Sequence, residues 1–185
     1  MKRILVLTDG KAGHENQSKA FARALGYDFE IKEIHFRGAV WKALSYLFDH
    51  LGLHTLSLYQ GFLPDLHADD GYVAVLGTGS GTFYAAKTIA RRLGVKSGVV
   101  LYPRGYRIST FDCVLAPAFD RPASASNVIE IPTNLVANDA AFYETGTKAF
   151  LERYTPSTKP AVAVIVPYVL AVELPPPAAP RFVQV

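Results

Sequence analysis

The sequence predicts an α/β domain of Rossmann-like type, in which a mostly parallel sheet has helices on both faces. Two continuous apolar runs, residues 4–7 and 72–76, have the composition of strands that are buried on both sides. Each run passes into a glycine-containing loop and then into a segment with helical periodicity. Strand and helix patterns alternate along most of the chain, which is typical of parallel sheets.

The composition of the chain is that of a globular domain. Its 185 residues suffice for one domain with a sizeable core. Hydrophobic residues make up 50% and charged residues 19%, which excludes a disordered chain. The net charge is only +3 and the longest basic cluster is Arg91-Arg92, so we expect no nucleic-acid partner.

The cysteine content and the apolar segments bear on where the protein works. The single cysteine, Cys113, rules out an internal disulfide framework and is typical of a reducing compartment. Only Lys2 and Arg3 precede the first apolar run, which is unlike a signal peptide. The most apolar stretch, residues 161–172, is interrupted by Pro167 and is too short to cross a bilayer. We therefore expect a cytoplasmic protein.

The first part of the chain predicts a strand, a glycine loop, a helix and a second strand. Residues 4–7 form the strand and residues 8–14 the loop, whose two glycines mark a tight turn. Apolar residues then recur at helical spacing up to Gly26, a common helix stop. Residues 29–36 predict the next strand.

A second helix is predicted over residues 40–51, and its apolar side chains share one face. We expect that face to pack on the core. The helix also carries Trp41, Lys42 and Tyr46, so contact with a membrane or a lipid-linked acceptor is the alternative. Residues 53–71 contain glycine, proline and an acidic pair, and predict a loop or an irregular crossover. The apolar face consists of Val40, Leu44, Leu47, Phe48 and Leu51.

The second part of the chain repeats the strand, loop and helix design. Residues 72–76 predict a strand and residues 77–82 a glycine loop, and the helix that follows is closed by Gly94. A last helix is expected to begin after Asp139, which can cap it, and to end near Arg153. Three short strands are predicted between these helices, over residues 98–102, 111–115 and 128–131.

The end of the chain differs in composition from the rest. We expect one folded domain over residues 1–158 and a proline-rich, linker-like tail over residues 159–185. Residues 161–166 could form a strand. The prolines at 175–177 and Pro180 remove backbone donors, so we expect this segment to pack poorly.

The first glycine loop is the leading candidate for a ligand site. Its glycines allow a close backbone approach, and the free N–H groups of the following helix favour an anion or a sugar oxygen. His14 could act as a catalytic base near neutral pH. The alternative is that the glycines only form the turn and that Asn16 only caps the helix. The candidate ligand-binding residues of this loop are Asp9, Gly10, Lys11, Gly13, Asn16 and Gln17.

A second glycine loop offers Gly77, Thr78, Gly79 and Ser80 as candidate ligand-binding residues. Its Gly-x-Gly-x-Gly pattern is not the dinucleotide fingerprint, because the third glycine comes one residue too early. Ligands of open parallel sheets bind at the carboxyl ends of strands, near the point where strand order reverses. We therefore expect both glycine loops side by side at one edge of the sheet, although turn formation alone is the alternative for the second.

Two further candidates follow later strands. Arg104 lies in the segment 102–107, where arginines could clamp a phosphate and tyrosines could stack on a base or a sugar. Asp120 could hydrogen-bond a sugar hydroxyl, whereas aspartate at a strand end is more often part of a turn. The histidines are scattered without the spacing of a known metal site, so no metal site is predicted.

Several of these motifs occur in an order that is known from one family. The string Asp9-Gly10-Lys11-Ala12-Gly13-His14-Glu15-Asn16-Gln17 is far more specific than a glycine pattern, and Gly77-Thr78-Gly79, Pro103-Arg104 and the segment 111–128 follow it. These residues resemble a mitochondrial-fission-like family of GT-B-type glycosyltransferases, whose bacterial members were once labelled nucleoside-diphosphate-sugar epimerases. The resemblance covers residues 1–166.

The resemblance implies a GT-B architecture, in which two Rossmann-like domains face a cleft. The N-terminal domain of such enzymes mostly binds the acceptor, and the C-terminal domain holds most of the nucleotide-sugar donor. No metal bound by an Asp-x-Asp motif and no other cofactor is implied. We therefore expect the acceptor-side half of a glycosyltransferase with an unidentified acceptor, and the alternative is a non-catalytic binding domain on the same scaffold.

The chain departs from the family in two places. Many members carry arginines after the second glycine loop, where this chain has Ser80-Gly81-Thr82. A strand and a further glycine-rich loop are expected to open the second domain, but this chain has Val166-Pro167-Tyr168 and then the proline-rich tail. We therefore expect the chain to correspond to the N-terminal half, and to show no sugar transfer by itself.

Overall fold

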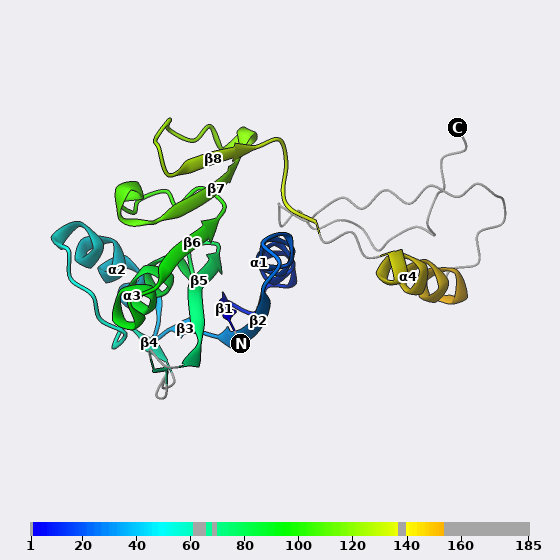
Figure 1. Cartoon of the computed structure of the whole chain (residues 1–185), viewed down its shortest axis with the longest axis horizontal. Helices are drawn as coiled ribbons and strands as arrows, with labels where there is room; N and C mark the ends of the chain where they lie inside the picture. The colour runs from blue at the N-terminus through cyan, green and yellow to red at the C-terminus, as the bar shows by residue number, and fades with distance from the viewer. Residues whose placement is uncertain (1, 61–65, 68–69, 137–139, 154–185) are drawn as a thin grey trace, which may run out of the picture. The chain divides into compact units, whose positions relative to one another are not determined.

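The computed structural model describes residues 2–60, 66–67, 70–136 and 140–153. Contacts divide the chain into two compact units, residues 1–137 and residues 138–185 (Figure 1). The domain boundary predicted between residues 158 and 159 and the proline-rich tail lie outside the described residues.

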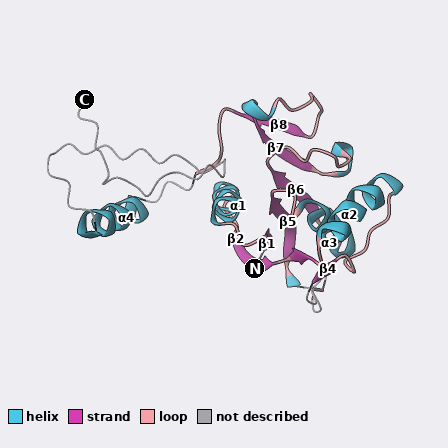
Figure 2. Ribbon diagram, turned by 180° about the vertical axis from the view of Figure 1, so that it is seen from behind, coloured by secondary structure: helices cyan, strands magenta, loops and turns pink. Residues whose placement is uncertain are grey.

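Parallel strands form a six-stranded sheet in the first unit: β1 (Arg3–Thr8), β2 (Asp28–Glu33), β5 (Tyr72–Thr78), β6 (Lys96–Val100), β7 (Cys113–Pro117) and β8 (Val128–Ile131). Their order across the sheet is β2-β1-β5-β6-β7-β8 (Figures 1 and 2). Strand order reverses at β1, because the chain adds β2 on one side of β1 and then crosses to β5 on the other. This sheet confirms the predicted α/β Rossmann-like class.

The helices of this unit are α1 (Ala12–Ala24), α2 (Ala39–Leu51) and α3 (Phe83–Leu93). They cover both faces of the sheet as predicted, with α1 on one side and α2 and α3 on the other (Figures 1 and 2). Ile4 and Val6 belong to the core on the α1 side, whereas Leu5 and Leu7 belong to the core on the α3 side. Because β1 is buried on both faces, its sequence is a continuous apolar run.

The strand predicted over residues 29–36 is divided in the structure, which corrects that prediction. After β2 the chain leaves the main sheet, and β3 (His35–Phe36) pairs antiparallel with β4 (Tyr59–Gln60). The rings of Phe36 and Tyr59 stack at this pairing, with their centroids 4.3 Å apart. A short two-stranded ribbon therefore occupies part of the segment predicted as an irregular crossover.

The most deeply buried side of α2 is polar, so the prediction that its apolar face packs on the core is confirmed only for Leu44 and Phe48, which are half-buried against the core. Ser45 and Asp49 are the buried residues of this helix. The Asp49 carboxylate accepts hydrogen bonds from Lys87 Nζ of α3 at 2.5 Å and from the backbone N–H of Arg107 at 2.6 Å. The Ser45 hydroxyl shares a hydrogen bond of 2.8 Å with the Tyr106 hydroxyl. These partners hold the polar side inward, and Val40, Leu47 and Leu51 of the predicted apolar face are left exposed.

The second unit contributes α4 (Ala140–Arg153), which confirms the helix predicted to end near Arg153. The predicted cap of this helix, Asp139, lies outside the described residues. No helix in the described part of the chain combines the length and the apolar character that are needed to cross a bilayer.

Candidate functional site

The two glycine loops meet at the carboxyl edge of the sheet, which confirms that they lie side by side. β1 and β5 are adjacent parallel strands, so the residues that follow them emerge at the same edge. His14, at the start of α1, lies against Gly79 of the second loop, and Asp9 lies against Gly81. Residues from two distant parts of the sequence therefore form one candidate site.

Asp9 and His14 form a hydrogen-bonded pair in this site. His14 Nδ1 lies 3.0 Å from Asp9 Oδ1, and the two side chains are only 22% and 10% exposed. Burial opposes the ionisation of Asp9, but the hydrogen bond and charge of His14, together with Lys11, outweigh it and lower the pKa of Asp9. When Nδ1 of His14 donates this hydrogen bond to the Asp9 carboxylate, Nε2 is the ring nitrogen left to exchange a proton with a ligand.

Gly79 and Gly81 leave the space that this pair occupies. Gly79 has a φ of +82°, and a Cβ there would lie 2.3 Å from Cε1 of His14. A Cβ on Gly81 would lie 2.9 Å from Cβ of Asp9. A side chain at either position would displace the pair, so these glycines do more than form a turn.

The other residues predicted in the first loop have different surroundings. A Cβ on Gly10, whose φ is +80°, would lie 3.1 Å from Oε1 of Glu33. Gly13 lies inside α1 with nothing within 4 Å of its Cβ position, and Asn16 is exposed inside the same helix rather than at its cap. Gln17 is buried, and its Oε1 has no hydrogen-bond partner among the described residues. Gln17 therefore keeps an acceptor that a ligand could use.

Gly77 and Thr78 support the packing of the second loop. A Cβ on Gly77 would lie 2.6 Å from Oγ1 of Thr82, so this glycine lets α3 begin close to its own strand. The Thr78 hydroxyl is buried and shares a hydrogen bond of 2.6 Å with Oγ of Ser18. This bond joins the second loop to α1.

Sequence reasoning missed several groups at this edge. Lys42, near the start of α2, donates a hydrogen bond of 2.8 Å to Oγ of Ser80. The sequence shows a lysine in the first turns of a helix, but only the structure shows that α2 begins beside the glycine loop. His35 Nε2 lies 2.7 Å from Oε1 of Glu33, beside Gly10. Both residues fell inside a predicted strand, which concealed their position at the edge.

Arg104 and Asp120 lie together in a second polar group, after β6 and β7. The Arg104 guanidinium donates to the backbone carbonyl of Asp120 and lies 5.4 Å from the centre of the Tyr102 ring. The Asp120 carboxylate accepts a long hydrogen bond of 3.4 Å from the backbone N–H of Tyr102. α2 contacts this segment too, because the ring of Tyr46 lies against Gly105. The candidates predicted from sequence therefore form two groups, and α2 contacts the loops of both.

The side chains at the two glycine loops determine which chemistry this site can perform. In the described part of the chain, no three His, Cys, Asp or Glu side chains gather closely enough to hold a metal ion. The site offers the Asp9–His14 pair and the ammonium groups of Lys11 and Lys42. Such a set can bind a ligand that carries hydroxyl or phosphate groups and can move one proton.

One known protein family matches most of the chain. The family model described as Mitochondrial fission ELM1 matches residues 12–166, a range that begins at the first residue of α1 and includes His14, Gly79 and Arg104. No curated protein and no solved structure was found to match the chain. The resemblance inferred from the first glycine loop is thus confirmed at the level of the family, and the chain belongs to the Mitochondrial fission ELM1 family.

Proposed function

We propose that this chain supplies the acceptor side of a sugar-transfer site that works with a nucleotide-sugar donor. The Asp9–His14 pair, enclosed by Gly79 and Gly81, is the observation that carries the proposal. The pair lies where strand order reverses, which is the usual ligand position in open α/β sheets. An imidazole that is oriented by a carboxylate can remove the proton from a hydroxyl nucleophile.

The proposed reaction moves one proton and exchanges one bond. Nε2 of His14 accepts the proton of the acceptor hydroxyl, while the hydroxyl oxygen forms a bond to the anomeric carbon of the donor sugar. The bond from that carbon to the diphosphate breaks, and the diphosphate leaves with its electron pair. Asp9, which is hydrogen-bonded to the opposite nitrogen, stabilises the resulting imidazolium.

The neighbouring groups are suited to binding rather than to the proton step. Lys11 and Lys42 bring positive charge to the two glycine loops. Gln17 Oε1 is a buried acceptor without a partner among the described residues. An unsatisfied buried acceptor lowers stability until a donor reaches it, so a ligand hydroxyl at Gln17 would gain both affinity and orientation.

The donor side of the site requires a second Rossmann-like domain across the cleft. Holding two substrates in register contributes on the order of 7–11 kcal/mol to catalysis in favourable cases. A chain that forms one wall of the cleft loses most of that contribution, together with the contacts to the diphosphate. We therefore expect weak ligand binding and no sugar transfer from the 185-residue chain alone.

Ligand titrations of the 185-residue chain test this proposal. Calorimetry with UDP-glucose, UDP-N-acetylglucosamine and GDP-mannose probes the donor, and a donor-hydrolysis assay probes turnover. NMR titration with free glucose, mannose and N-acetylglucosamine probes the acceptor through the signals of the His14 ring. We expect weak binding of a monosaccharide that His14→Ala and Lys11→Ala reduce while circular dichroism shows that both variants remain folded. His50→Ala, which changes an exposed histidine of α2, is the matched control.

Two results would contradict the proposal in different ways. Robust turnover of a nucleotide-sugar by the chain alone would overturn the acceptor-side assignment, because the donor site would then lie within these loops. Monosaccharide binding that is unchanged in His14→Ala and Lys11→Ala would remove the carboxyl-edge loops from the site.

A non-catalytic binding domain on the same scaffold is the second hypothesis, because the fold by itself does not determine the function. Asp9→Asn in a protein reconstituted with a donor-side domain separates the two hypotheses, because it disturbs the orientation of His14 with little change in size. Loss of transfer with retained ligand binding supports the enzyme, whereas ligand binding without any transfer by the unchanged protein supports the binding domain.

A further inference from the structure

The outer side of α2 carries an exposed apolar surface. Val40, Leu47 and Leu51 recur at the spacing of one helix face, and they are 70%, 52% and 63% exposed. Trp41 and Leu53 flank them and are 39% and 48% exposed. These five residues are called the α2 outer face. Exposed apolar surfaces that gather several large side chains often mark contacts with another protein or with a membrane.

The fold holds the α2 outer face outward. On the opposite side of the helix, Asp49 is bound to Lys87, and Ser45 is bound to Tyr106. Turning the helix would leave a buried lysine and a buried carboxylate unpaired, which is strongly destabilising. α2 is also the outermost helix on its side of the sheet in both views (Figures 1 and 2). The side chains of the α2 outer face therefore do not take part in the core of this unit.

Carboxylates are scarce in the segments around this face, so the cations there give them a net positive charge. Residues 34–60 and 71–111, which include α2, α3 and β6, contain eight of the 19 Lys and Arg residues and one of the 16 Asp and Glu residues of the chain. That single carboxylate is Asp49, which is 1% exposed. These two segments therefore present cations to solvent and no exposed carboxylate.

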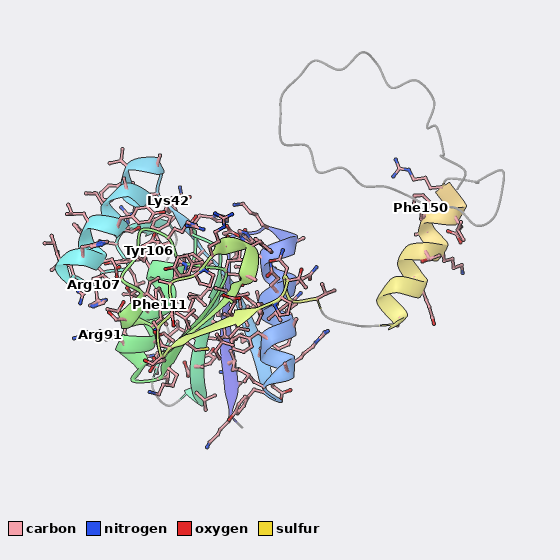
Figure 3. All side chains as sticks on the ribbon, turned by 90° about the horizontal axis from the view of Figure 1, so that it is seen from above. Lys42, Arg91, Tyr106, Arg107, Phe111 and Phe150 are labelled. Carbon is pink, nitrogen blue, oxygen red and sulfur yellow. The ribbon has the colours of Figure 1, made fainter. Side chains whose placement is uncertain are left out.

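Basic side chains lie on the same side of the unit as α2. Figure 3 shows Lys42, Arg107 and Arg91 along that side. Nη1 of Arg107 lies 3.8 Å from the Cβ position of Gly52, directly after α2. No described carboxylate forms an ion pair with any of these three cations. Their charges remain available to an anionic partner.

A cavity of about 380 Å³ adjoins the C-terminal end of α2 and is lined by His54, Thr55, Leu56, Thr88, Arg91 and Arg92. Nδ1 of His54 is buried and has no hydrogen-bond partner among the described residues. Burial and the charges of Arg91 and Lys87 lower the pKa of His54, which favours the neutral imidazole. Two guanidinium groups beside an imidazole nitrogen without a partner are suited to a phosphate group.

We propose that the α2 outer face docks on an anionic phospholipid bilayer, and that the cavity beside it receives a headgroup phosphate. Helices that lie in a membrane interface place an apolar side at the acyl boundary and cations at the headgroups. Here the α2 outer face is the apolar side, and the surrounding cations and the cavity are positioned for the headgroups. A tryptophan at the margin is typical of that interface. Membrane contact was the alternative that the sequence left open for this helix, and the proposal assigns that contact to the α2 outer face.

Co-sedimentation of the 185-residue chain with vesicles tests the proposal. The vesicles contain phosphatidylcholine alone or phosphatidylcholine mixed with phosphatidylglycerol. We expect binding to the mixed vesicles only, and weaker binding at high salt, which screens the cations. The double variant Leu47→Gln/Leu51→Gln should lower partitioning on the order of tenfold or more, because two leucine side chains no longer enter the bilayer. Arg91→Gln/Arg92→Gln should lower it by about fivefold for each charge.

Ile129→Gln is the matched control for the leucine variant. Ile129 is 52% exposed, as Leu47 is, but it lies on the edge strand β8. Its variant should bind the mixed vesicles like the unchanged chain. Circular dichroism and thermal unfolding should show all variants folded, because the substituted side chains are exposed.

Several outcomes would overturn the proposal. One is a folded chain that does not bind the mixed vesicles, and another is full binding by Leu47→Gln/Leu51→Gln. A dimer in light scattering that this double variant abolishes would assign the face to a second copy of the chain. Inorganic phosphate that shifts the NMR signals of His54, without any vesicle binding, would assign the cavity to a soluble anion.

Discussion

α2 and α3 contact each other on the same side of the sheet, yet they bury opposite kinds of residue. Nine of the 11 residues of α3 are buried, and most of them are apolar. In α2 only Ser45 and Asp49 of 13 residues are buried, and both are polar. Both sequences show helical periodicity, but only in α3 does the whole apolar side face the core. In α2, Leu44 and Phe48 pack against the core, whereas Val40, Leu47 and Leu51 are exposed. Periodicity thus defines the two sides of a helix but not the direction in which each side points.

The difference arises from one charged residue of α3. Lys87 is buried in that helix, and burial lowers its pKa despite the opposing effect of Asp49. A buried ammonium group requires a carboxylate, and Asp49 of α2 supplies it at 2.5 Å. α2 therefore turns Asp49 towards α3, and the side chains of Val40, Leu47 and Leu51 point to solvent.

The largest expected effect comes from breaking this ion pair. Lys87→Met leaves the Asp49 carboxylate buried without its cation, and we expect a loss of about 3–5 kcal/mol in the free energy of unfolding. Urea denaturation of the full chain measures this loss. Lys96→Met is the control, because its ion pair with Asp112 is exposed and should matter little. Equal losses in both variants would show that the Lys87–Asp49 pair does not orient α2.

A pair of apolar truncations compares the two helices directly. Ile89 of α3 is 1% exposed, and Ile89→Ala should lower the free energy of unfolding by about 2–5 kcal/mol through lost packing. Leu47 of α2 is 52% exposed, and Leu47→Ala should change it by no more than about 0.5 kcal/mol. The two denaturation curves check both values. A large loss in Leu47→Ala would mean that the α2 outer face is covered in solution.

Two glycine substitutions, one in the loop that leads into α3 and one in α1, should change the free energy of unfolding by smaller amounts and in opposite directions. Gly79→Ala places a side chain at a φ of +82° and against the His14 ring, so we expect a loss of about 1–3 kcal/mol and a displaced His14. Gly13→Ala lies inside α1 in open space and should stabilise the chain by about 0.5–1 kcal/mol. Urea denaturation measures the change in the free energy of unfolding for both variants, and NMR of the His14 ring reports its displacement. A neutral Gly79→Ala would contradict the close contact of the two loops.

The smallest expected effect is a pH dependence beside α3. Burial and the charges of Arg91 and Lys87 lower the pKa of His54 below its usual 6.5. The unfolded chain therefore binds a proton at His54 before the folded chain does, so His54 lowers the stability as the pH falls below 6.5. Comparing the pH dependence of urea denaturation between the chain and His54→Asn isolates this contribution. A variant with the same slope below pH 6.5 would contradict the lowered pKa.

Much of the fold could be predicted from local patterns. The continuous apolar runs of β1 and β5 identified strands that are buried on both faces, and Gly94 marked the end of α3. The short ribbon of β3 and β4 could not be predicted, because two-residue strands have no periodicity and depend on the stacking of Phe36 on Tyr59. Sequence patterns predict an element correctly where many neighbouring residues share one environment. They fail where a single contact between residues distant in sequence determines the local structure.

The candidate site shows the same division. The sequence identified the first glycine loop and the second, and the rule for parallel sheets placed them at one edge. It did not show that Gly79 makes room for His14 or that Gly81 makes room for Asp9, because these contacts join the loops of two strands. Lys42 was missed for the same reason, since its role depends on where α2 begins relative to Ser80.

The sequence by itself determined the class of the fold, the family, and the loops that carry polar groups to the carboxyl edge. These properties follow from local composition, because a buried strand must be apolar and a tight turn needs glycine. Only the tertiary structure decided the direction of α2. Asp49 finds Lys87 38 residues further along the chain, and the free energy of burying either charge depends on the presence of the other. No local pattern contains that partner, so the apolar surface of α2 becomes visible only in the folded molecule.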